Sequence, residues 1–242
     1  MKALNIAICE DDSAEFDKLS AILDTCGFDL VTEHFTDGSG LVSGYYTGKY
    51  DLLLVDIYMN GLNGIDTVAK IRQMDGDVPI AFITTSLDHA LDGYRYHVDR
   101  YITKPLNPEE ITDILRKALF RKESQPVLPI TFANKTINIP LGQIRYLESI
   151  IDTVHIYLSG GGIEKTRAKL KDIAPLLPQP PFYVCHKSFI VNLSFVAGYD
   201  KAQCLFEMKE GGKAYVKREC KTEADRILRQ YMFDLARKQS NS

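Results

Sequence analysis

The five residues 52–56 (LLLVD) constrain the fold of this chain more than any other stretch, because four adjacent apolar residues end in a carboxylate. A short, unbroken apolar run is typical of a strand that is buried on both faces of a parallel sheet. In open α/β sheets, binding sites form beyond the carboxyl ends of such strands, which is where Asp56 lies. On position alone, Asp56 is either a site residue or an ordinary helix cap, and the rest of the sequence has to decide between the two.

The length and composition set the broad class. At 242 residues with 45% hydrophobic residues, the chain is expected to form one large domain or two ordinary ones, with full cores. No apolar segment approaches the ~20 residues that span a bilayer, and the N-terminus has no signal-peptide pattern. The five cysteines are scattered without a Cys-x-x-Cys pair, which is typical of free thiols. We therefore expect a cytoplasmic protein with no membrane partner.

The charge is distributed unevenly between the two halves of the chain. Residues 1–123 hold 12 Lys and Arg against 21 Asp and Glu, a net charge of -9, while residues 124–242 hold 17 against 11, a net +6. An acidic half joined to a basic half indicates two different partners, and the basic half is a candidate for nucleic acid. A surplus of six positive charges is also compatible with an ordinary solvated surface.

The first half alternates apolar runs with amphipathic segments. Strands are expected over residues 4–9, 28–35, 52–56, 78–84 and 100–103. Helices are expected from Ser13, with Phe16, Leu19, Leu23 and Cys26 on one face, over residues 40–48, 64–74 and 88–96, and from Pro108 after an Asn107 cap. This alternation predicts an α/β doubly wound, five-stranded parallel sheet.

Polar side chains stand at the ends of these strands. Glu10 and Asp11 follow the first strand and Asp56 ends the third, while Thr84 ends the fourth and Lys104 follows the fifth. Three carboxylates in one place favour a cation, and hard oxygen ligands suit Mg²⁺. A hydroxyl and an ammonium nearby can hold phosphoryl oxygens, so the set predicts a phosphoryl-acceptor site with Asp56 as the acceptor. Taken singly, Glu10 or Asp11 could be a helix cap, Thr84 a solvated hydroxyl and Lys104 a surface charge.

With these residues in view, residues 1–122 resemble the flavodoxin-like receiver domain of two-component response regulators. The resemblance implies that Asp56 is phosphorylated and that Mg²⁺ is held by Glu10, Asp11, Asp56 and the main-chain carbonyl of Tyr58. It also implies that Thr84 and Tyr101 are switch residues, that Lys104 binds the phosphoryl group, and that Pro105 follows a cis peptide bond. One departure is Asn60, which stands where the family usually has proline.

The second half is expected to be mostly β. Residues 123–128 (ESQPVL) indicate a linker, and strand candidates follow over 130–133, 136–139, 145–149, 154–158, 163–167, 182–185, 195–199, 204–208 and 213–216. Asn134-Lys135 is predicted to form a hairpin turn. A short helix over 169–177 and a terminal helix over 222–238 complete the elements. No phosphate loop, nucleophile motif or paired carboxylates are found, so no enzymatic activity is expected.

Residues 130–237 resemble the LytTR-type DNA-binding domain, most clearly in Cys185–Asn192 (CHKSFIVN) and also in Ile144–Ser149 and Val216–Arg218. The resemblance implies an elongated β domain at residues 129–238, whose loops enter successive major grooves. It implies that Lys187 and Arg218 contact bases and that the loop over residues 151–155 supplies a third contact. His186 and Asn192 could instead be scaffold residues. The implied DNA-contacting set is Lys187, Arg218, His155, Thr153, His186 and Lys217.

The two resemblances together imply a cytosolic response regulator. A sensor histidine kinase would supply the phosphoryl group, the phosphorylated chain would form a homodimer, and the dimer would bind repeated sites in promoter DNA, with RNA polymerase as a further candidate partner. Two other functions compete with this interpretation. One is an adaptor whose basic half docks on an acidic protein, and the other is an enzyme regulated by a receiver domain.

Overall fold

The computed structural model describes residues 3–85 and 96–240, and the chain divides into two compact units, Met1–Gln125 and Pro126–Ser242. Most of the linker expected over residues 123–128 belongs to regular elements, because a helix runs to Ser124 and a strand begins at Val127. The helix expected over residues 88–96 falls almost entirely outside the described residues. Within the described residues, no helix is long and apolar enough to cross a membrane.

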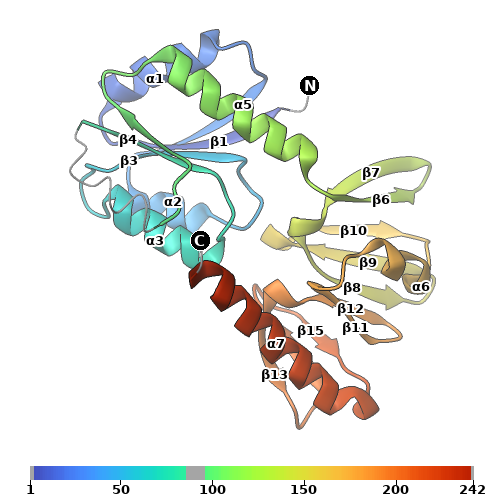
Figure 1. Ribbon diagram of the computed structural model, residues 1–242. Helices are drawn as coiled ribbons and strands as arrows, with labels where there is room; N and C mark the ends of the chain where they lie inside the picture. The colour runs from blue at the N-terminus through green and yellow to red at the C-terminus, as the bar shows by residue number, and fades with distance from the viewer. Residues whose placement is uncertain (1–2, 86–95, 241–242) are drawn as a thin grey trace. The chain divides into compact units, whose positions relative to one another are not determined.

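The first unit is an open parallel sheet with the strand order β2-β1-β3-β4-β5, which confirms the predicted fold class (Figure 1). All four pairings between neighbouring strands are parallel, so every strand ends at the same edge. The elements are β1 (Leu4–Cys9), α1 (Ser13–Thr25), β2 (Leu30–Phe35), α2 (Gly38–Gly44), β3 (Leu52–Asp56), α3 (Gly64–Met74), β4 (Ile80–Thr84), β5 (Arg100–Thr103) and α5 (Pro108–Ser124).

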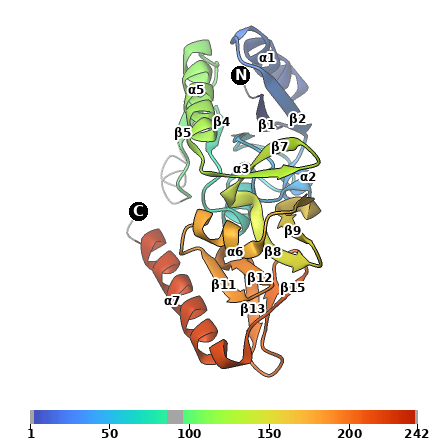
Figure 2. The same cartoon turned by 90° about the vertical axis from the view of Figure 1, so that its right-hand side faces the viewer.

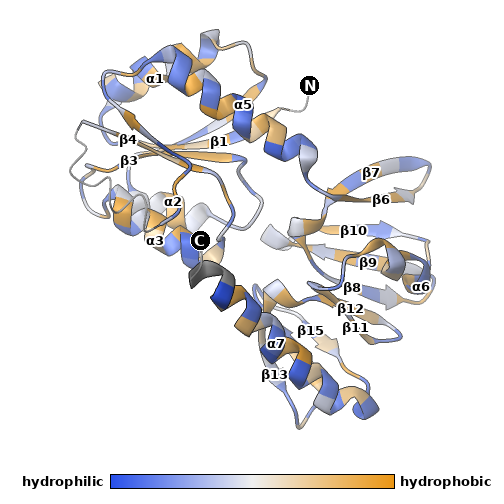
Figure 3. Ribbon diagram, in the orientation of Figure 1, coloured by the Kyte–Doolittle hydropathy of each residue, from blue (hydrophilic) through white to orange (hydrophobic). Residues whose placement is uncertain are grey.

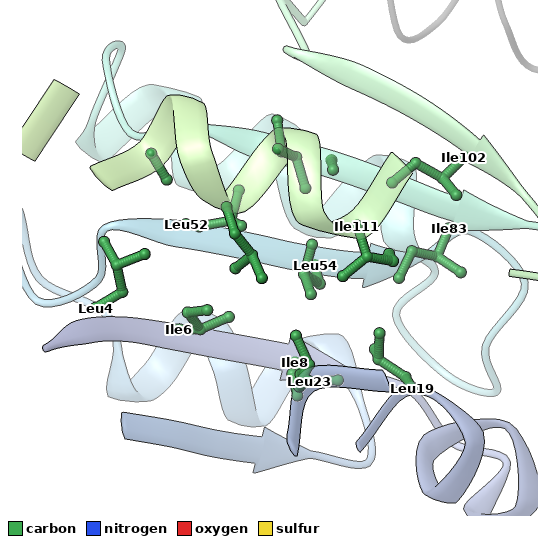
Figure 4. Close-up of a cluster of buried hydrophobic side chains, with 14 residues drawn as sticks. Leu4, Ile6, Ile8, Leu19, Leu23, Leu52, Leu54, Ile83, Ile102 and Ile111 are labelled. Carbon is green, nitrogen blue, oxygen red and sulfur yellow. The ribbon is translucent and has the colours of Figure 1, made fainter. Parts of the chain in front are cut away.

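Helices cover both faces of this sheet, and β3 explains why the sheet needs them. Leu52 and Leu54 point into a core closed by α1 and α5, whereas Leu53 and Val55 point into a second core closed by α2 and α3. Figure 4 shows the first core, to which β3 contributes Leu52 and Leu54, α1 contributes Leu19 and α5 contributes Ile111. Successive side chains of a strand point to opposite faces of the sheet. Four consecutive apolar residues therefore contribute to both cores and fix β3 at the centre of the sheet.

Local sequence sets the helix starts beside the strand ends. Asp12 accepts hydrogen bonds from the first-turn amides of α1, Asn63 does so for α3, and Asn107 caps α5 ahead of Pro108. Gly64 is required where α3 begins, because a Cβ there would lie 2.1 Å from the main-chain oxygen of Asp56. The loop after β3 thus folds back tightly over the end of its own strand.

The second unit contains a five-stranded sheet with the order β10-β9-β8-β12-β11, a three-stranded sheet β13-β14-β15 and the hairpin β6-β7. All its strand pairings are antiparallel. The strands are β6 (Val127–Phe132), β7 (Lys135–Pro140), β8 (Ile144–Ile150), β9 (Thr153–Leu158), β10 (Ile163–Thr166), β11 (Phe182–His186), β12 (Phe189–Asn192), β13 (Val196–Asp200), β14 (Leu205–Met208) and β15 (Lys213–Tyr215). The helices are α6 (Leu170–Ile173) and α7 (Lys221–Ser240).

The second unit differs from the sequence-based expectation in its first hairpin turn, in one strand, and in the helix expected over residues 169–177, whose α-helical part is only Leu170–Ile173. The turn between β6 and β7 is formed by Ala133 and Asn134 rather than by Asn134 and Lys135, since φ is +49° and +63° at the former pair while Lys135 already pairs with Phe132. Strand β12 was not expected as a separate strand. It lies beside β8 at the middle of its sheet and all four of its residues are buried.

Two cores hold the second unit together. One face of the five-stranded sheet packs against β6, β7 and α6, and the other packs against the three-stranded sheet and α7. Helix α7 lies along the strands of this unit in Figure 2, and its alternating colours in Figure 3 reflect a single apolar side. That side carries Ala224, Ile227, Leu228 and Tyr231 into the core.

Candidate functional site

Three of the predicted residues meet at the carboxyl edge of the parallel sheet. The Nζ of Lys104 lies 2.8 Å from Oε2 of Glu10 and 2.8 Å from Oδ2 of Asp56. The side chains of all three residues are buried, with relative exposures of 5 to 8%. Strands β1, β3 and β5 therefore deliver two carboxylates and one ammonium to a single point, as their order along the chain predicted.

The charges in this pocket depend on one another. Burial raises the pKa of the Glu10 carboxyl, and the nearby charge of Asp56 raises it further, against the opposing effect of Lys104. Burial by itself would lower the pKa of Lys104, but hydrogen bonds from its ammonium to Asp56 and Glu10 outweigh this, and the pKa is raised. Lys104 consequently remains a cation that compensates two buried carboxylates.

Asp11 takes a different position from the other two carboxylates. Its Oδ2 accepts hydrogen bonds from the main-chain N and the side-chain Nδ2 of Asn60, at 2.9 and 2.8 Å. Within residues 3–85 and 96–240, no group of three His, Cys, Asp or Glu side chains stands ready to hold a metal ion. The main-chain N of Tyr58 donates to Oδ1 of Asp56 at 3.1 Å, so the loop after β3 folds around the acceptor.

The two predicted switch residues lie on β4 and β5. Thr84 is fully buried, and its main-chain oxygen accepts a hydrogen bond from the main-chain N of Lys104 at 2.7 Å. Tyr101 is partly buried, and its ring meets Phe82 edge-on at a centroid distance of 5.9 Å. Because Ile83 pairs with Asp56, Thr84 is the next residue along β4 beyond the acceptor. Thr84 thus lies on the strand next to that of the acceptor, and Tyr101 lies one strand further along the sheet.

The donor set agrees with the chemistry of Mg²⁺, which prefers hard oxygen ligands. Glu10, Asp11 and Asp56 offer only oxygen, and the main-chain carbonyl of Tyr58 follows in the same loop. No sulfur or imidazole ligand takes part in the predicted set. The residues therefore fit this ion in ligand chemistry, while the three carboxylates are hydrogen-bonded to Lys104 and Asn60 in the structure. The assignment of Glu10, Asp11, Asp56 and Tyr58 as ligands remains a prediction.

In the second unit, three segments of the predicted DNA-contacting set lie side by side. The turn between β8 and β9 adjoins the turn between β11 and β12, because the main-chain N of Ser149 donates to the oxygen of Ser188 at 2.8 Å. The segment after β15 adjoins β11, because the main-chain N of Lys217 donates to the oxygen of Cys185 at 3.0 Å. Three segments that are far apart in the sequence thus form one edge of the unit.

The predicted DNA-contacting residues are not equally accessible on this edge. Lys187, Lys217 and Arg218 are exposed, whereas Thr153, His155 and His186 are half-buried. Thr153 donates its hydroxyl to the main-chain oxygen of Ile150, which braces the β8–β9 turn. The exposed cations are the ones suited to reach a phosphate or a base.

Two residues of the CHKSFIVN block have structural roles. Nδ1 of His186 accepts a hydrogen bond from the main-chain N of Ser188 at 3.1 Å and closes the turn that presents Lys187. Asn192 donates to the main-chain oxygen of Ile144 at 2.9 Å and accepts from the main-chain N of Ser194. These contacts favour a scaffold role for both side chains. His186 stays in the predicted DNA-contacting set because it shapes the turn that presents Lys187.

Sequence reasoning missed the role of Arg145. This buried guanidinium donates to the main-chain oxygens of Lys209 and Gly211 and so holds the β14–β15 turn against β8. The available signal was a charged residue between two apolar ones, Ile144 and Tyr146, at the start of the Ile144–Ser149 block. Glu210, Gly211 and Gly212 all have positive φ in that turn, which explains its need for an external brace.

Cys185 is packed rather than reactive. Burial raises the pKa of its thiol to about 12, and its Sγ lies 3.6 Å from the main-chain oxygen of Phe189. A thiolate is the reactive form of cysteine, and this environment disfavours it. The five cysteines are all free thiols.

Comparisons with known families agree with both halves of the chain. The family model of the response regulator receiver domain matches residues 6–116, and the family model of the LytTR DNA-binding domain matches residues 134–229. The second match favours DNA over an acidic protein as the partner of the basic half.

Individual relatives match the chain to different extents. The chain is 26% identical to the sensory transduction protein LytT of Oceanobacillus iheyensis over 202 residues, which cover 80% of this chain and 82% of that protein. It is 30% identical to the DNA-binding response regulator MtrA of Mycolicibacterium paratuberculosis over 57% of this chain and 61% of that one. A similar solved structure is the receiver domain of a sensor histidine kinase from Pseudomonas aeruginosa PAO1, which has magnesium in its active-site cleft. It is 22% identical, covers 49% of this chain and 99% of its own, and has a TM-score of 0.45.

Proposed function

Because the chain belongs to the response regulators that join a receiver domain to a LytTR DNA-binding domain, we propose that phosphorylation of Asp56 controls its binding to repeated DNA sites. The family consists of DNA-binding regulators, which are not enzymes acting on a separate substrate. The observation that carries the proposal is the meeting of Glu10, Asp56 and Lys104 at one strand edge.

The chemistry proposed for Asp56 is phosphoryl transfer from a phosphohistidine on a sensor kinase. A carboxylate oxygen attacks phosphorus, the P–N bond breaks, and the released imidazole keeps the electron pair. Bound Mg²⁺, held by Glu10, Asp11, Asp56 and the carbonyl of Tyr58, supplies positive charge that offsets the charge of the phosphoryl oxygens. Lys104 is already within 2.8 Å of the acceptor and needs only to exchange a carboxylate oxygen for a phosphoryl oxygen.

The proposed response begins with the added charge of about -1.5 to -2 on Asp56. The Thr84 hydroxyl hydrogen-bonds to a phosphoryl oxygen, and Tyr101 repacks because it lies on the neighbouring strand. The surface containing β5 and α5 changes shape and supports a homodimer. A dimer places two LytTR domains on a repeated promoter site, where linkage raises the effective concentration of the second domain.

For DNA recognition, we assign the base contacts to Lys187 and Arg218, which are exposed on neighbouring segments. Lys217 is assigned to phosphate, and Thr153 and His155 support the adjoining β8–β9 turn as the third contact. A dimer bound at the promoter could then recruit RNA polymerase. All these events take place in the cytoplasm under the proposal.

The test is phosphorylation of the full chain by a small-molecule phosphoryl donor with Mg²⁺, read by intact-protein mass spectrometry. Wild type should gain one acid-labile phosphoryl group, and Asp56→Asn should gain none. Asp113→Asn, an exposed carboxylate on α5, is the matched control and should behave as wild type. Stoichiometric labelling of Asp56→Asn would rule out the assignment.

The DNA part of the proposal is tested separately by selecting sequences from a random duplex library with phosphorylated full chain. Recovery of a repeated motif, with tighter binding after phosphorylation and a steep loss of affinity with salt, is the expected result. A salt-independent interaction would count against direct DNA binding.

A further inference from the structure

Ile151 is an apolar side chain that the fold leaves in solvent. It stands at the tip of the hairpin between β8 and β9 and is 94% exposed, more than any other large apolar residue in the ranges that the structure describes. Its neighbours Ile150 and Thr153 pair across the hairpin, so Ile151 and Asp152 alone form the turn. An isoleucine that remains exposed in the folded unit contributes no hydrophobic stabilisation to it.

The backbone at Ile151 is also strained. Its φ is +53°, a region that Gly and Asn adopt readily and that a β-branched residue rarely does. Other described residues with positive φ and a side chain are His97, Ala133, Asn134, Cys204 and Glu210, and none of these is β-branched. An exposed turn normally avoids both features, so their coincidence at Ile151 indicates that the side chain is used outside the folded unit.

The position of the turn identifies the partner. The main-chain hydrogen bond between Ser149 and Ser188 fixes the β8–β9 turn beside the β11–β12 turn, which carries Lys187. The Thr153 hydroxyl donates to the oxygen of Ile150, so the tip is held in place rather than left loose. Whatever DNA surface Lys187 reaches, Ile151 therefore reaches the surface next to it.

The chemistry of the tip identifies the kind of contact. Ile151 and Asp152 carry no cationic or hydroxyl donor for a phosphate, and the Asp152 carboxylate would be repelled by one. In the major groove, by contrast, thymine presents a C5 methyl group to an apolar side chain, and a carboxylate can accept a hydrogen bond from the amino group of cytosine. The pair is thus suited to base edges and not to the backbone.

We propose that Ile151 recognises thymine through contact with its C5 methyl group and is a specificity-determining residue of the β8–β9 turn. This inference rests on the proposed DNA-binding function and adds a residue and a base to it. Ile151 would distinguish thymine from other bases by the shape of its methyl group, while Lys187 and Arg218 would form hydrogen bonds with other base edges. A contact of this size should change affinity about 3- to 10-fold.

The test uses phosphorylated full chain and the duplex obtained by library selection, with each thymine replaced in turn by uracil. Uracil lacks only the C5 methyl group, so base pairing and the other groove atoms stay the same. The affinity of wild type should fall about 3- to 10-fold when one particular thymine in each repeat is replaced by uracil. Ile151→Ala should bind the thymine duplex more weakly by a similar factor and should show no further loss at that uracil.

Two further variants separate this role from folding and from general apolar contact. Ile151→Gly removes the side chain and suits a positive φ, so its melting temperature should equal or exceed that of wild type while its discrimination is lost. Ile163→Ala, at the opposite end of the β9–β10 pair and also exposed, should retain the wild-type uracil pattern.

The outcomes divide clearly. If Ile151→Ala keeps the uracil pattern of wild type, or binds all duplexes equally less well, Ile151 does not recognise thymine. If the variant changes only self-association, measured by sedimentation, the residue serves contacts between copies and the inference is overturned. A wild-type chain that selects no DNA sequence overturns the proposed function and this inference together, whereas a selected motif leaves the function standing whatever Ile151 does.

Discussion

Asn60 donates two hydrogen bonds to one carboxylate oxygen of Asp11, from its main-chain N at 2.9 Å and from its side chain at 2.8 Å. Proline, the usual residue at this position in receiver domains, has neither a main-chain N–H nor a side-chain donor. The contact therefore distinguishes this chain within its family, and it joins the loop after β1 to the loop after β3. It also engages a carboxylate that is predicted to bind Mg²⁺.

The first prediction concerns the affinity for Mg²⁺. The side-chain hydrogen bond stabilises Asp11 in the metal-free chain, and an ion must compete with it. Asn60→Ala removes this bond, worth about 0.5–1.5 kcal/mol, and should tighten Mg²⁺ binding about 2- to 10-fold in calorimetric titrations. Gln73→Ala, an exposed amide on α3, is the control and should leave the affinity unchanged. Weaker binding by Asn60→Ala would mean that the hydrogen bond prepares Asp11 for the ion instead.

The second prediction concerns Lys104. Lys104→Met leaves Glu10 and Asp56 buried without their cation, and Glu10 can take up a proton to limit the cost. We expect a loss of about 1.5–3 kcal/mol in the free energy of unfolding of the receiver unit in EDTA. Mg²⁺ should raise the melting temperature of this variant more than that of wild type, because the ion supplies the missing positive charge.

Lys122→Met is the matched control for Lys104. Lys122 also pairs with a partly buried carboxylate, that of Asp51 at 2.7 Å, and it donates to the main-chain oxygen of Ala3. Its loss should destabilise the unit without any added response to Mg²⁺. Equal responses of the two variants would show that the Lys104 pocket has no special affinity for the ion.

The receiver unit could be predicted closely because its signals are local and repeated. The apolar run Leu52–Asp56 predicts a central strand and the parallel order brings strand ends together, so Glu10, Asp56 and Lys104 meet as expected. The hydrogen bonds of Asn60 could not be predicted, because they depend on the path of two loops. Sequence patterns give the ends of strands, but they do not give loop conformations.

The second unit was harder to predict for two physical reasons. Strand β12 is apolar on both faces because it lies between two cores, so it lacks the alternation expected of an antiparallel strand. The turn at Ala133-Asn134 needs positive φ at an alanine, which no local preference indicates. The neighbouring positions of the Lys187 and Lys217 segments likewise follow from long-range pairing.

The third prediction concerns alkaline pH and Cys185. Its folded pKa, about 12, lies above the ordinary value near 8.5, so the folded state keeps a proton that the unfolded state loses between these values. The thiol therefore contributes stability that is complete below about pH 8.5 and is lost progressively as the pH rises towards 12. Cys185→Ala should remove a slope of up to about 1.4 kcal/mol per pH unit from the free energy of unfolding of this unit.

Urea denaturation between about pH 8 and 10.5 measures that slope for the second unit. Val191→Ala is the control, because it removes buried packing from the same core without removing a titratable group, and it should leave the slope as in wild type. Cys185→Ala is also expected to lower the free energy of unfolding at neutral pH, because packing is lost. This decrease does not depend on pH. An unchanged slope in Cys185→Ala would show that the thiol ionises in the folded state as easily as in water.

The fourth prediction separates Arg218 from Lys217, two exposed cations that are adjacent in sequence. A base contact at Arg218 predicts that Arg218→Ala costs about 1–3 kcal/mol on the selected duplex and relaxes preference at one base pair. A phosphate contact at Lys217 predicts that Lys217→Ala weakens binding equally on all sequences and lowers the salt slope by about one. Because Lys217 is 3.6 Å from the carboxylate of Glu219, part of its charge is already offset and its effect should be the smaller. Affinities measured on selected and scrambled duplexes at several salt concentrations distinguish the two roles, and a sequence-independent loss in Arg218→Ala would reassign that residue to phosphate.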